Sequence, residues 1–225
     1  LHGLSGTPYE IRPLGEGLAA AGFAVAGPAL PGHASSPEAL AEISSWRVWL
    51  EAARDAAAGL RKRHRTVYVA GLSMGGLLSL ALAAEGAVDA IAVIGTPLRL
   101  PLVVRAAVPW LWRIKPYFAK SGGSDIRDEA ARARHPSYPV MPIRAVHELV
   151  RLQRHVDSIL PQVRQPILVA HGALDTTARP ADADEIVRRV ASTERTLHRY
   201  ERSGHVVPVD LDGAALVSDV VGFFQ

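Results

Sequence analysis

Residues 67–85, VYVAGLSMGGLLSLALAAE, change from one hydrophobic pattern to another within a few positions. The stretch begins with β-branched and aromatic residues in alternation, which is typical of a strand. It ends with leucine and alanine residues, which are typical of a helix. Gly71, Ser73, Gly75 and Gly76 lie where the patterns meet. Because both patterns are apolar, strand and helix must both be buried, and this favours an α/β fold.

The rest of the chain alternates in the same way. Apolar or alternating runs predict strands at 23–27, 66–70, 89–95, 166–172 and 195–200. A first helix is expected after TPYE, with Thr7 at its N-cap, Pro8 at the first helical position and Glu10 at the third. Helical spacing predicts further helices near 45–60, 74–85, 181–190 and 211–224. The expected fold class is therefore α/β, with a mostly parallel sheet and helices on both faces.

The region between Gly95 and Pro166 interrupts this alternation. It has no clear strand, and it contains the apolar run LPLVVRAAVPWLWRIKPYF and a second helical stretch at 143–160. Insertions of this length in a compact domain are commonly lids. We therefore expect a helical cap at 97–161 on a core formed by 1–96 and 162–225.

Bulk properties exclude several classes of protein. The 225 residues, 48% of them apolar, suffice for one domain with a substantial core. The absence of cysteine excludes disulfides and thiolate metal sites and fits a reducing compartment, so a cytoplasmic location is expected. No apolar run is long enough to span a membrane. The sequence opens with LHG and has no signal peptide, and we expect a segment of the natural chain to precede it.

The charge pattern gives no indication of a nucleic-acid partner. The net charge is +3, and the longest basic run is RKRHR at 61–65. No aromatic residues interleave with these charges, as a stacking platform for bases would require. We interpret the run as the end of a helix, where cations oppose the negative end of the helix dipole.

Residues 71–75 have the pattern G-x-S-x-G. A serine on a sharp strand-to-helix turn has strained backbone angles, and glycines two positions away on each side leave room for it. The turn exposes the Ser73 hydroxyl at a helix N-terminus, where backbone N–H groups stabilise negative charge. This favours a nucleophile over a glycine turn that only packs the helix on the sheet. A phosphate-binding loop is excluded, because no Gly-Lys-Ser/Thr ending follows.

A serine nucleophile needs a base, and the chain has nine histidines. His205, in RSGHVVPVD, follows the last expected strand and so lies at the same sheet edge as Ser73. His2, His33 and His171 also fall at expected strand ends, where we expect them to shape a loop, line the pocket and cap a strand. The other five are expected on the surface. His205 is therefore the predicted base.

The base needs a carboxylate to orient it. The segment TPLRLP, after one expected strand, contains no acid, whereas HGALDTTA, after the next, contains Asp175. Two later acids, Asp182 and Asp184, fall in the first turn of a helix, where acids favour the dipole. Ser73, Asp175 and His205 then follow the chain order serine, acid, histidine.

Negative charge on the reacting oxygen needs two N–H donors. One is the amide of Met74, and the segment LHGLSGTP, which ends a strand and opens a helix, offers the amide of Leu4 as the second. This chemistry requires no metal and no cofactor, and the zinc pattern H-E-x-x-H is absent.

Together these segments resemble the α/β-hydrolase superfamily, and more closely its small bacterial carboxylesterases and monoacylglycerol lipases with a short cap. The resemblance covers nearly the whole chain, through HGLSGTP, RPLGEGLAAAGF, LPGH, GLSMGG, SGGSDI, LDTTA and SGHVV. It implies Ser73 as nucleophile, Asp175 and His205 as its partners, and Leu4 and Met74 as oxyanion donors.

Two features depart from the family pattern. The two or three strands that normally precede the HG segment are absent from this sequence, which would leave a sheet edge exposed. Related lipases recognise glycerol through a polar cap residue, but the matching stretch, 110–117, contains Arg113 and Lys115 and no acid.

We therefore expect a carboxylesterase that cleaves small-molecule esters, acyl lipids among them, with an apolar acyl group through an acyl-enzyme. A monoacylglycerol lipase, an acyltransferase or a perhydrolase with the same triad remains an alternative. A dehalogenase is disfavoured, because it needs a carboxylate where Ser73 lies, and a non-catalytic protein would tend to lose a triad member. Residues 97–123 have five basic and no acidic residues, so they suit either solvated cap helices or weak contact with anionic lipid interfaces.

Overall fold

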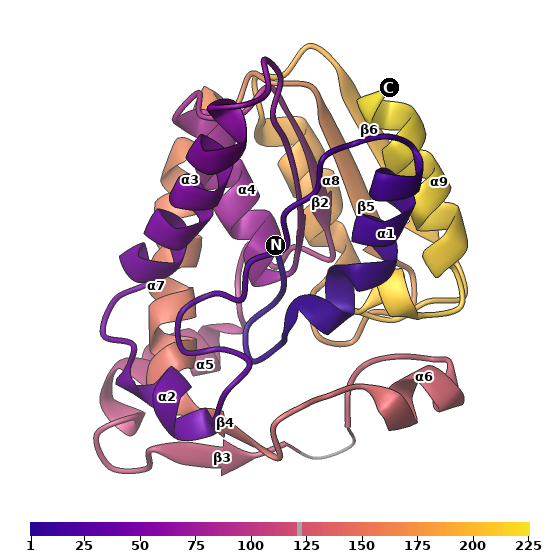
Figure 1. The fold of residues 1–225 in the computed structure, drawn as a ribbon. Helices are drawn as coiled ribbons and strands as arrows, with labels where there is room; N and C mark the ends of the chain where they lie inside the picture. Colours follow the sequence, from indigo (N-terminus) through magenta and orange to yellow (C-terminus); the bar gives the residue numbers. More distant parts are fainter. Residues whose placement is uncertain (121–122) are drawn as a thin grey trace.

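The computed structural model describes residues 1–120 and 123–225 (Figure 1). Within them, the main sheet has four parallel strands in the order β1 (Tyr68–Leu72), β2 (Ala90–Ile94), β5 (Ile167–Gly172) and β6 (Arg195–Tyr200). A separate antiparallel pair consists of β3 (Tyr117–Ala119) and β4 (Val140–Pro142). The predicted α/β class with a mostly parallel sheet is therefore confirmed.

Helices cover both faces of the main sheet (Figure 1). Because successive strand side chains point to opposite faces, Ile91 and Val93 face one core layer, and Ala92 and Ile94 face the other. The first layer contains α3 (Arg47–Arg61), α4 (Met74–Ala84), α7 (Ile143–Ile159) and α8 (Pro180–Arg189). The second layer contains α1 (Arg12–Ala20) and α9 (Gly213–Phe224). The other helices are η1 (Pro8–Ile11), α2 (Pro37–Glu42), α5 (Leu102–Leu111), α6 (Glu129–Arg134), η2 (Leu160–Gln162) and η3 (Val207–Val209).

Two local predictions need correction. Residues 23–27 are not a strand, because a strand needs a hydrogen-bonded neighbour and these residues pair with none in the described part of the chain. The strand predicted at 66–70 lies two residues later, as β1, and therefore runs directly into the serine turn. Thr7 caps the first helical turn as predicted, accepting a hydrogen bond from the Tyr9 amide.

The outer edge of β1 borders a cavity of about 1110 Å³. Leu1 pairs with this edge, since its nitrogen donates to the Ala70 carbonyl and its carbonyl accepts from the Leu72 amide. The cavity is lined by parts of α1 and α3, by residues 22–28 and by Phe224. None of the predicted catalytic residues line it, although its volume exceeds that of the cavity that Ser73 lines.

Residues 97–161 contain α5, β3, α6, β4 and α7, so the segment includes two short strands that its sequence did not reveal. Figure 1 shows β3, β4 and α6 below the carboxyl ends of the main strands. Helix α7 packs on α4 in the core as well as on α5. The division into a cap at 97–161 and a core at 1–96 and 162–225 therefore stays a proposal.

Candidate active site

Ser73 is the single residue between β1 and α4. Its backbone angles are φ 56° and ψ −115°, in a region that residues other than glycine rarely adopt. Its amide donates to the Ile94 carbonyl at 2.8 Å, which extends the β1–β2 pairing into the turn. Such strain persists only where the surrounding structure imposes it, and it is common at active sites.

Two glycines make the turn possible. A Cβ atom on Gly71 would overlap the carbonyl group of Gly75 in the first turn of α4. A Cβ atom on Gly75 would overlap the carbonyl oxygen of Leu1. The glycines in G-x-S-x-G therefore have a steric cause. On each side of Ser73, neighbouring backbone lies so close to Gly71 and to Gly75 that neither position has room for a side chain.

Asp175 and His205 form a buried pair. Nδ1 of His205 lies 2.8 Å from Oδ2 of Asp175, while Oδ1 accepts the amides of Thr177 and Ala178, each at 2.8 Å. Burial opposes ionisation of Asp175, but hydrogen bonds from His171 and His205 outweigh it and hold its pKa far below the usual range. Burial lowers the pKa of His205, but the hydrogen bond and the charge of Asp175 outweigh this and raise it above the ordinary histidine value.

The topology explains why these residues meet. Ser73, Asp175 and His205 follow β1, β5 and β6, and parallel strands end at the same sheet edge. Gly95, at the end of β2, has φ 52°, and a Cβ atom there would lie 3.3 Å from Nδ1 of His205. The glycine therefore keeps the middle of this edge open for the imidazole.

Ser73, His205 and Leu4 line one cavity of about 570 Å³. Much of its lining is apolar and comes from α5, α7, β3 and β4. The residues include Val104, Val108, Leu111, Phe118, Met141, Ile143, Val146 and Leu149. In the described part of the chain, no hydrogen bond joins the Ser73 hydroxyl to His205. The structure thus brings the acid and the histidine into contact and places the serine in the same cavity.

Of the two predicted oxyanion donors, Met74 directly follows this serine and Leu4 lines the same cavity. Among the described residues, the amides of Leu4 and Met74 have no hydrogen-bond acceptor. The neighbouring Gly3 amide is occupied, because it donates to the Glu10 carboxylate at 3.1 Å. Ser5, with φ 57°, completes the tight turn that carries Leu4. Two amides without acceptors beside a strained serine suit a developing oxyanion.

Sequence reasoning underestimated three side chains near the site. His135 was expected on the surface, but it is buried, with Nε2 3.2 Å from Glu10 and Nδ1 2.7 Å from the Ser124 hydroxyl. His171 was expected only to cap a strand, but its Nε2 lies 3.0 Å from Oδ2 of Asp175. The role of His135 depends on a contact with Glu10 in a distant segment, which no local pattern could have revealed. Asp175 is only four residues after His171, but the sequence does not show that the strand end turns the two side chains toward each other.

Asp125 is the third side chain near the site whose role was underestimated. It belongs to the motif SGGSDI, which could have indicated it. Residues 121–122 of that motif lie outside the described structure. Its carboxylate accepts from the Thr176 amide at 2.7 Å and the Thr176 hydroxyl at 2.9 Å. Its backbone carbonyl accepts the His205 amide at 2.9 Å. Asp125 therefore ties the loop of the acid to the loop of the histidine.

The other histidines at strand ends have different places. His2 was expected to shape the loop that follows it, and its Nδ1 lies 2.9 Å from the Gly3 carbonyl oxygen of that loop. Its Nε2 accepts the Leu30 amide at 3.0 Å and so links the loop to a distant segment. His33 does not line the cavity, and instead packs against His2 and Trp49. Within the described residues, no group of three or more histidine, aspartate and glutamate side chains is arranged to hold a metal ion.

Known proteins are similar to this chain in sequence and in fold. The profile of the family described as serine aminopeptidase, S33, matches residues 1–212. A thermostable monoacylglycerol lipase of Bacillus sp. (strain H-257) is 30% identical over 224 residues, covering 100% of this chain and 88% of the lipase. A carboxylesterase of Bacillus subtilis (strain 168) is 25% identical over 227 residues, covering 100% of this chain and 90% of the esterase.

Solved structures agree with these matches. A structure reported for the metagenome-derived lipolytic enzymes LipS and LipT has a TM-score of 0.93 at 30% identity, covering 99% of this chain and 90% of that one. A monoacylglycerol lipase of Paleococcus ferrophilus has a TM-score of 0.83 at 17% identity, covering 99% of this chain and 91% of that one. At this identity, the match supports the fold alone. The chain therefore belongs to the serine aminopeptidase S33 family and is a hydrolase of the α/β-hydrolase group.

Proposed function

We propose that this chain hydrolyses carboxylic esters with an apolar acyl group through an acyl-enzyme on Ser73. The observation that carries the proposal is the cavity of about 570 Å³, which the strained serine and the histidine of the Asp175–His205 pair line together. Ester hydrolysis also agrees with the lipase and the carboxylesterase to which the chain is similar.

In the proposed mechanism, Oγ of Ser73 attacks the ester carbonyl while Nε2 of His205 accepts its proton. Asp175 stabilises the imidazolium, and the amides of Leu4 and Met74 stabilise the oxyanion. His205 then protonates the departing alcohol. In the second half, His205 takes a proton from water as the water oxygen attacks the acyl-enzyme. The bond from the acyl carbon to Oγ of Ser73 then breaks, His205 returns the proton to Oγ, and the carboxylic acid leaves.

The apolar lining supports an acyl-lipid-like substrate, and an acyl-chain series tests this. With p-nitrophenyl esters, we expect kcat/KM to rise from acetate to medium chains, because each buried methylene contributes about 0.8 kcal/mol. Val146 lines the cavity. Val146→Trp should therefore shift the preference to shorter acyl groups, while Val48→Trp on the outer face of α3 should not. A preference that is the same in both variants would contradict an acyl site at this lining.

Two other reactions use the same residues. The family description names an aminopeptidase, so ester and p-nitroanilide substrates with the same acyl group separate an esterase from an amidase. An acyltransferase or a perhydrolase would give ester or peracid product when an alcohol or hydrogen peroxide is added. We expect the free acid to remain the main product with either addition.

The proposed base predicts an acid limb in the pH profile. Since Asp175 raises the pKa of His205, its imidazole gains a proton at a higher pH than an ordinary histidine, whose pKa is about 6.5. A protonated imidazole cannot accept the serine proton, so kcat/KM should fall as the pH decreases through this raised pKa. The measurement is a pH–rate profile from pH 4.5 to 9, and a profile that stays flat down to pH 4.5 would contradict His205 as the base.

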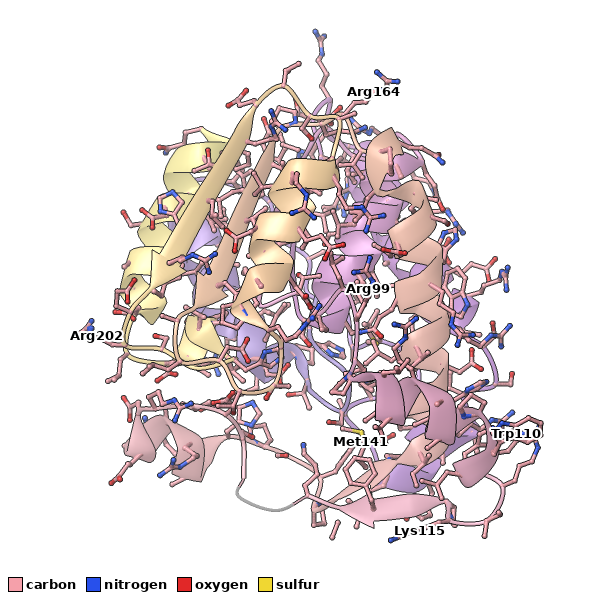
Figure 2. All side chains as sticks on the ribbon, turned by 180° about the vertical axis from the view of Figure 1, so that it is seen from behind. Arg99, Trp110, Lys115, Met141, Arg164 and Arg202 are labelled. Carbon is pink, nitrogen blue, oxygen red and sulfur yellow. The ribbon has the colours of Figure 1, made fainter. Side chains whose placement is uncertain are left out.

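We also propose weak contact between a lipid interface and the outer face of α5. Leu102, Val103, Trp110 and Ile114 are all more than 70% exposed, and basic residues lie among them. Figure 2 shows Trp110 and Lys115 on the outside of the cap. An exposed apolar surface with a cationic border suits an anionic lipid surface.

Among the residues described, none of the helices is long and apolar enough to cross a membrane. Arg99 does not contribute to the proposed surface, because it pairs with Asp157 and Glu185 at 2.7 and 2.8 Å between α7 and α8 (Figure 2).

Replacing Arg105, Arg113 and Lys115 with glutamine should weaken binding to phosphatidylserine vesicles at least 10-fold. A basic residue near an anionic surface contributes about 1 kcal/mol, so three lost charges exceed that threshold. Vesicle co-sedimentation at low and physiological salt measures the effect. The matched control removes Arg61, Lys62 and Arg63 at the end of α3, and equal losses in both variants would exclude a specific role for the cap.

A further inference from the structure

We propose that His171 is a positioning residue of the active site, which holds the Asp175 carboxylate and takes up part of its negative charge through an Nε2–H···Oδ2 hydrogen bond. The inference rests on the proposed function, because it assigns His171 to the same acid that orients His205. It adds a second histidine to the serine, acid and base of the triad.

The carboxylate of Asp175 has four donors around it. Oδ1 accepts two backbone amides from the loop that follows it, and Oδ2 lies 2.8 Å from Nδ1 of His205 and 3.0 Å from Nε2 of His171. A carboxylate offers about four lone-pair positions, so this set fills them. The two histidines approach the same oxygen, and His171 is thus part of what fixes the plane of the acid.

The surroundings of His171 indicate which ring nitrogen carries the hydrogen. The side chain lies in β5 and is 1% exposed, and in the described part of the chain its Nδ1 is buried without a hydrogen-bond partner. A proton on Nδ1 would be a buried donor without an acceptor, which is unfavourable. The tautomer with its hydrogen on Nε2 avoids this. The Nε2 hydrogen is directed at the Ala178 carbonyl oxygen, 3.4 Å away, and Oδ2 of Asp175 lies closer to Nε2, at 3.0 Å, so the two acceptors share this hydrogen.

Because His171 and His205 share Oδ2 of Asp175, His171 affects how strongly His205 holds a proton. Two donors on one oxygen each see less negative charge than a single donor would, so His171 limits how strongly Asp175 attracts a proton to His205. Asp125 and Glu10 also act on the His205 imidazole, and their charges do not depend on His171. Without the His171 donor, His205 would face a more negative oxygen and hold its proton to a higher pH.

A matched set of variants tests this role. Phenylalanine in place of His171 keeps the ring and removes the donor, whereas glutamine places an amide N–H near the former Nε2. For His171→Phe we expect kcat at the plateau to fall about 3- to 10-fold with KM unchanged, and the acid limb to move up by about 0.3 to 1 pH unit. His171→Gln should resemble the parent protein in its plateau kcat and in the position of its acid limb. His198→Phe, on the neighbouring strand β6, is the control for loss of an imidazole.

The outcomes separate positioning from simple space filling. If His171 only fills space, His171→Phe lowers the melting temperature and leaves the acid limb in place, and that result overturns the proposal. A limb that moves to lower pH, or a glutamine variant that behaves like phenylalanine, also overturns it. If His171→Phe does not fold, His171→Asn replaces it, because its shorter amide cannot reach Asp175.

Two further measurements keep this proposal distinct from the proposed function. An NMR titration of the His205 ring protons follows its pKa without any substrate, and the shift in His171→Phe should match that of the acid limb. In the Asp175→Ala background, His171→Phe should cause no further loss of kcat. Failure of either result, in a protein whose hydrolysis still depends on Ser73, overturns the role of His171 alone.

Discussion

Ser73→Ala is expected to lower ester hydrolysis by about 10⁴- to 10⁶-fold while leaving the fold intact. Loss of a triad nucleophile removes the acyl-enzyme route and leaves only the contribution of binding and the oxyanion donors. The side chain is half-buried at the edge of the cavity, so alanine creates little packing loss. We therefore expect unchanged thermal unfolding and a KM that cannot be measured for lack of turnover.

The measurement is p-nitrophenyl ester hydrolysis with matched protein concentrations, supported by burst kinetics in the parent protein. Ser218→Ala on the exposed face of α9 is the control, with activity expected to equal that of the parent. Covalent labelling by a fluorophosphonate should occur in the parent and control and disappear in Ser73→Ala. Hydrolysis that survives in Ser73→Ala would refute the acyl-enzyme on this serine and with it the proposed function.

Gly71→Ala is expected to destabilise the protein by about 3–5 kcal/mol and to abolish activity with it. The added methyl group would overlap the carbonyl group of Gly75 and approach the hydroxyl oxygen of Ser79. Since backbone in the first turn of a buried helix cannot move aside cheaply, the strand and α4 must separate. The serine turn between them would then lose its geometry.

Thermal unfolding tests this prediction, with an expected fall in the melting temperature of about 10 °C or more. Gly59→Ala in α3 is the matched control, because a Cβ atom there meets nothing within 4 Å. Alanine is a better helix former than glycine, so the control should be stabilised by about 0.5–1 kcal/mol. A Gly71→Ala protein as stable as the parent would mean that the turn is looser than the contacts around Gly71 indicate.

Much of the fold could be predicted because its signals are local. The apolar strand and helix on either side of Ser73 are adjacent in sequence, and their periods differ. The family and the ester-hydrolase class predicted from these motifs are confirmed by the sequence relatives. The roles of Ser73, Asp175, His205, Leu4 and Met74 remain predictions for the variants above to test.

The errors arose where structure depends on a partner distant in sequence. Residues 23–27 have a strand-like composition, but composition cannot supply the neighbour that a strand needs. Glu10 has the position of a helix-capping acid, yet its carboxylate binds the Gly3 amide and pairs with His135 from beyond α6. The contact between Glu10 and His135 depends on which loops meet at the edge of the sheet, and no short window of the sequence encodes it.

The sequence by itself determined the order serine, acid, histidine and the turn that presents the serine, because glycine spacing and strand ends impose them through local sterics and parallel topology. Only the tertiary structure decided what surrounds the acid. His171, which its sequence position suggested as a strand cap, shares Oδ2 of Asp175 with His205. Asp125, from a segment about 50 residues earlier, joins the two loops that carry that pair. The contacts of Asp175 with His205 and of Asp125 with both loops form only when the loops meet at one edge of the sheet, since hydrogen bonds act over about 3 Å in space, whatever the separation along the chain.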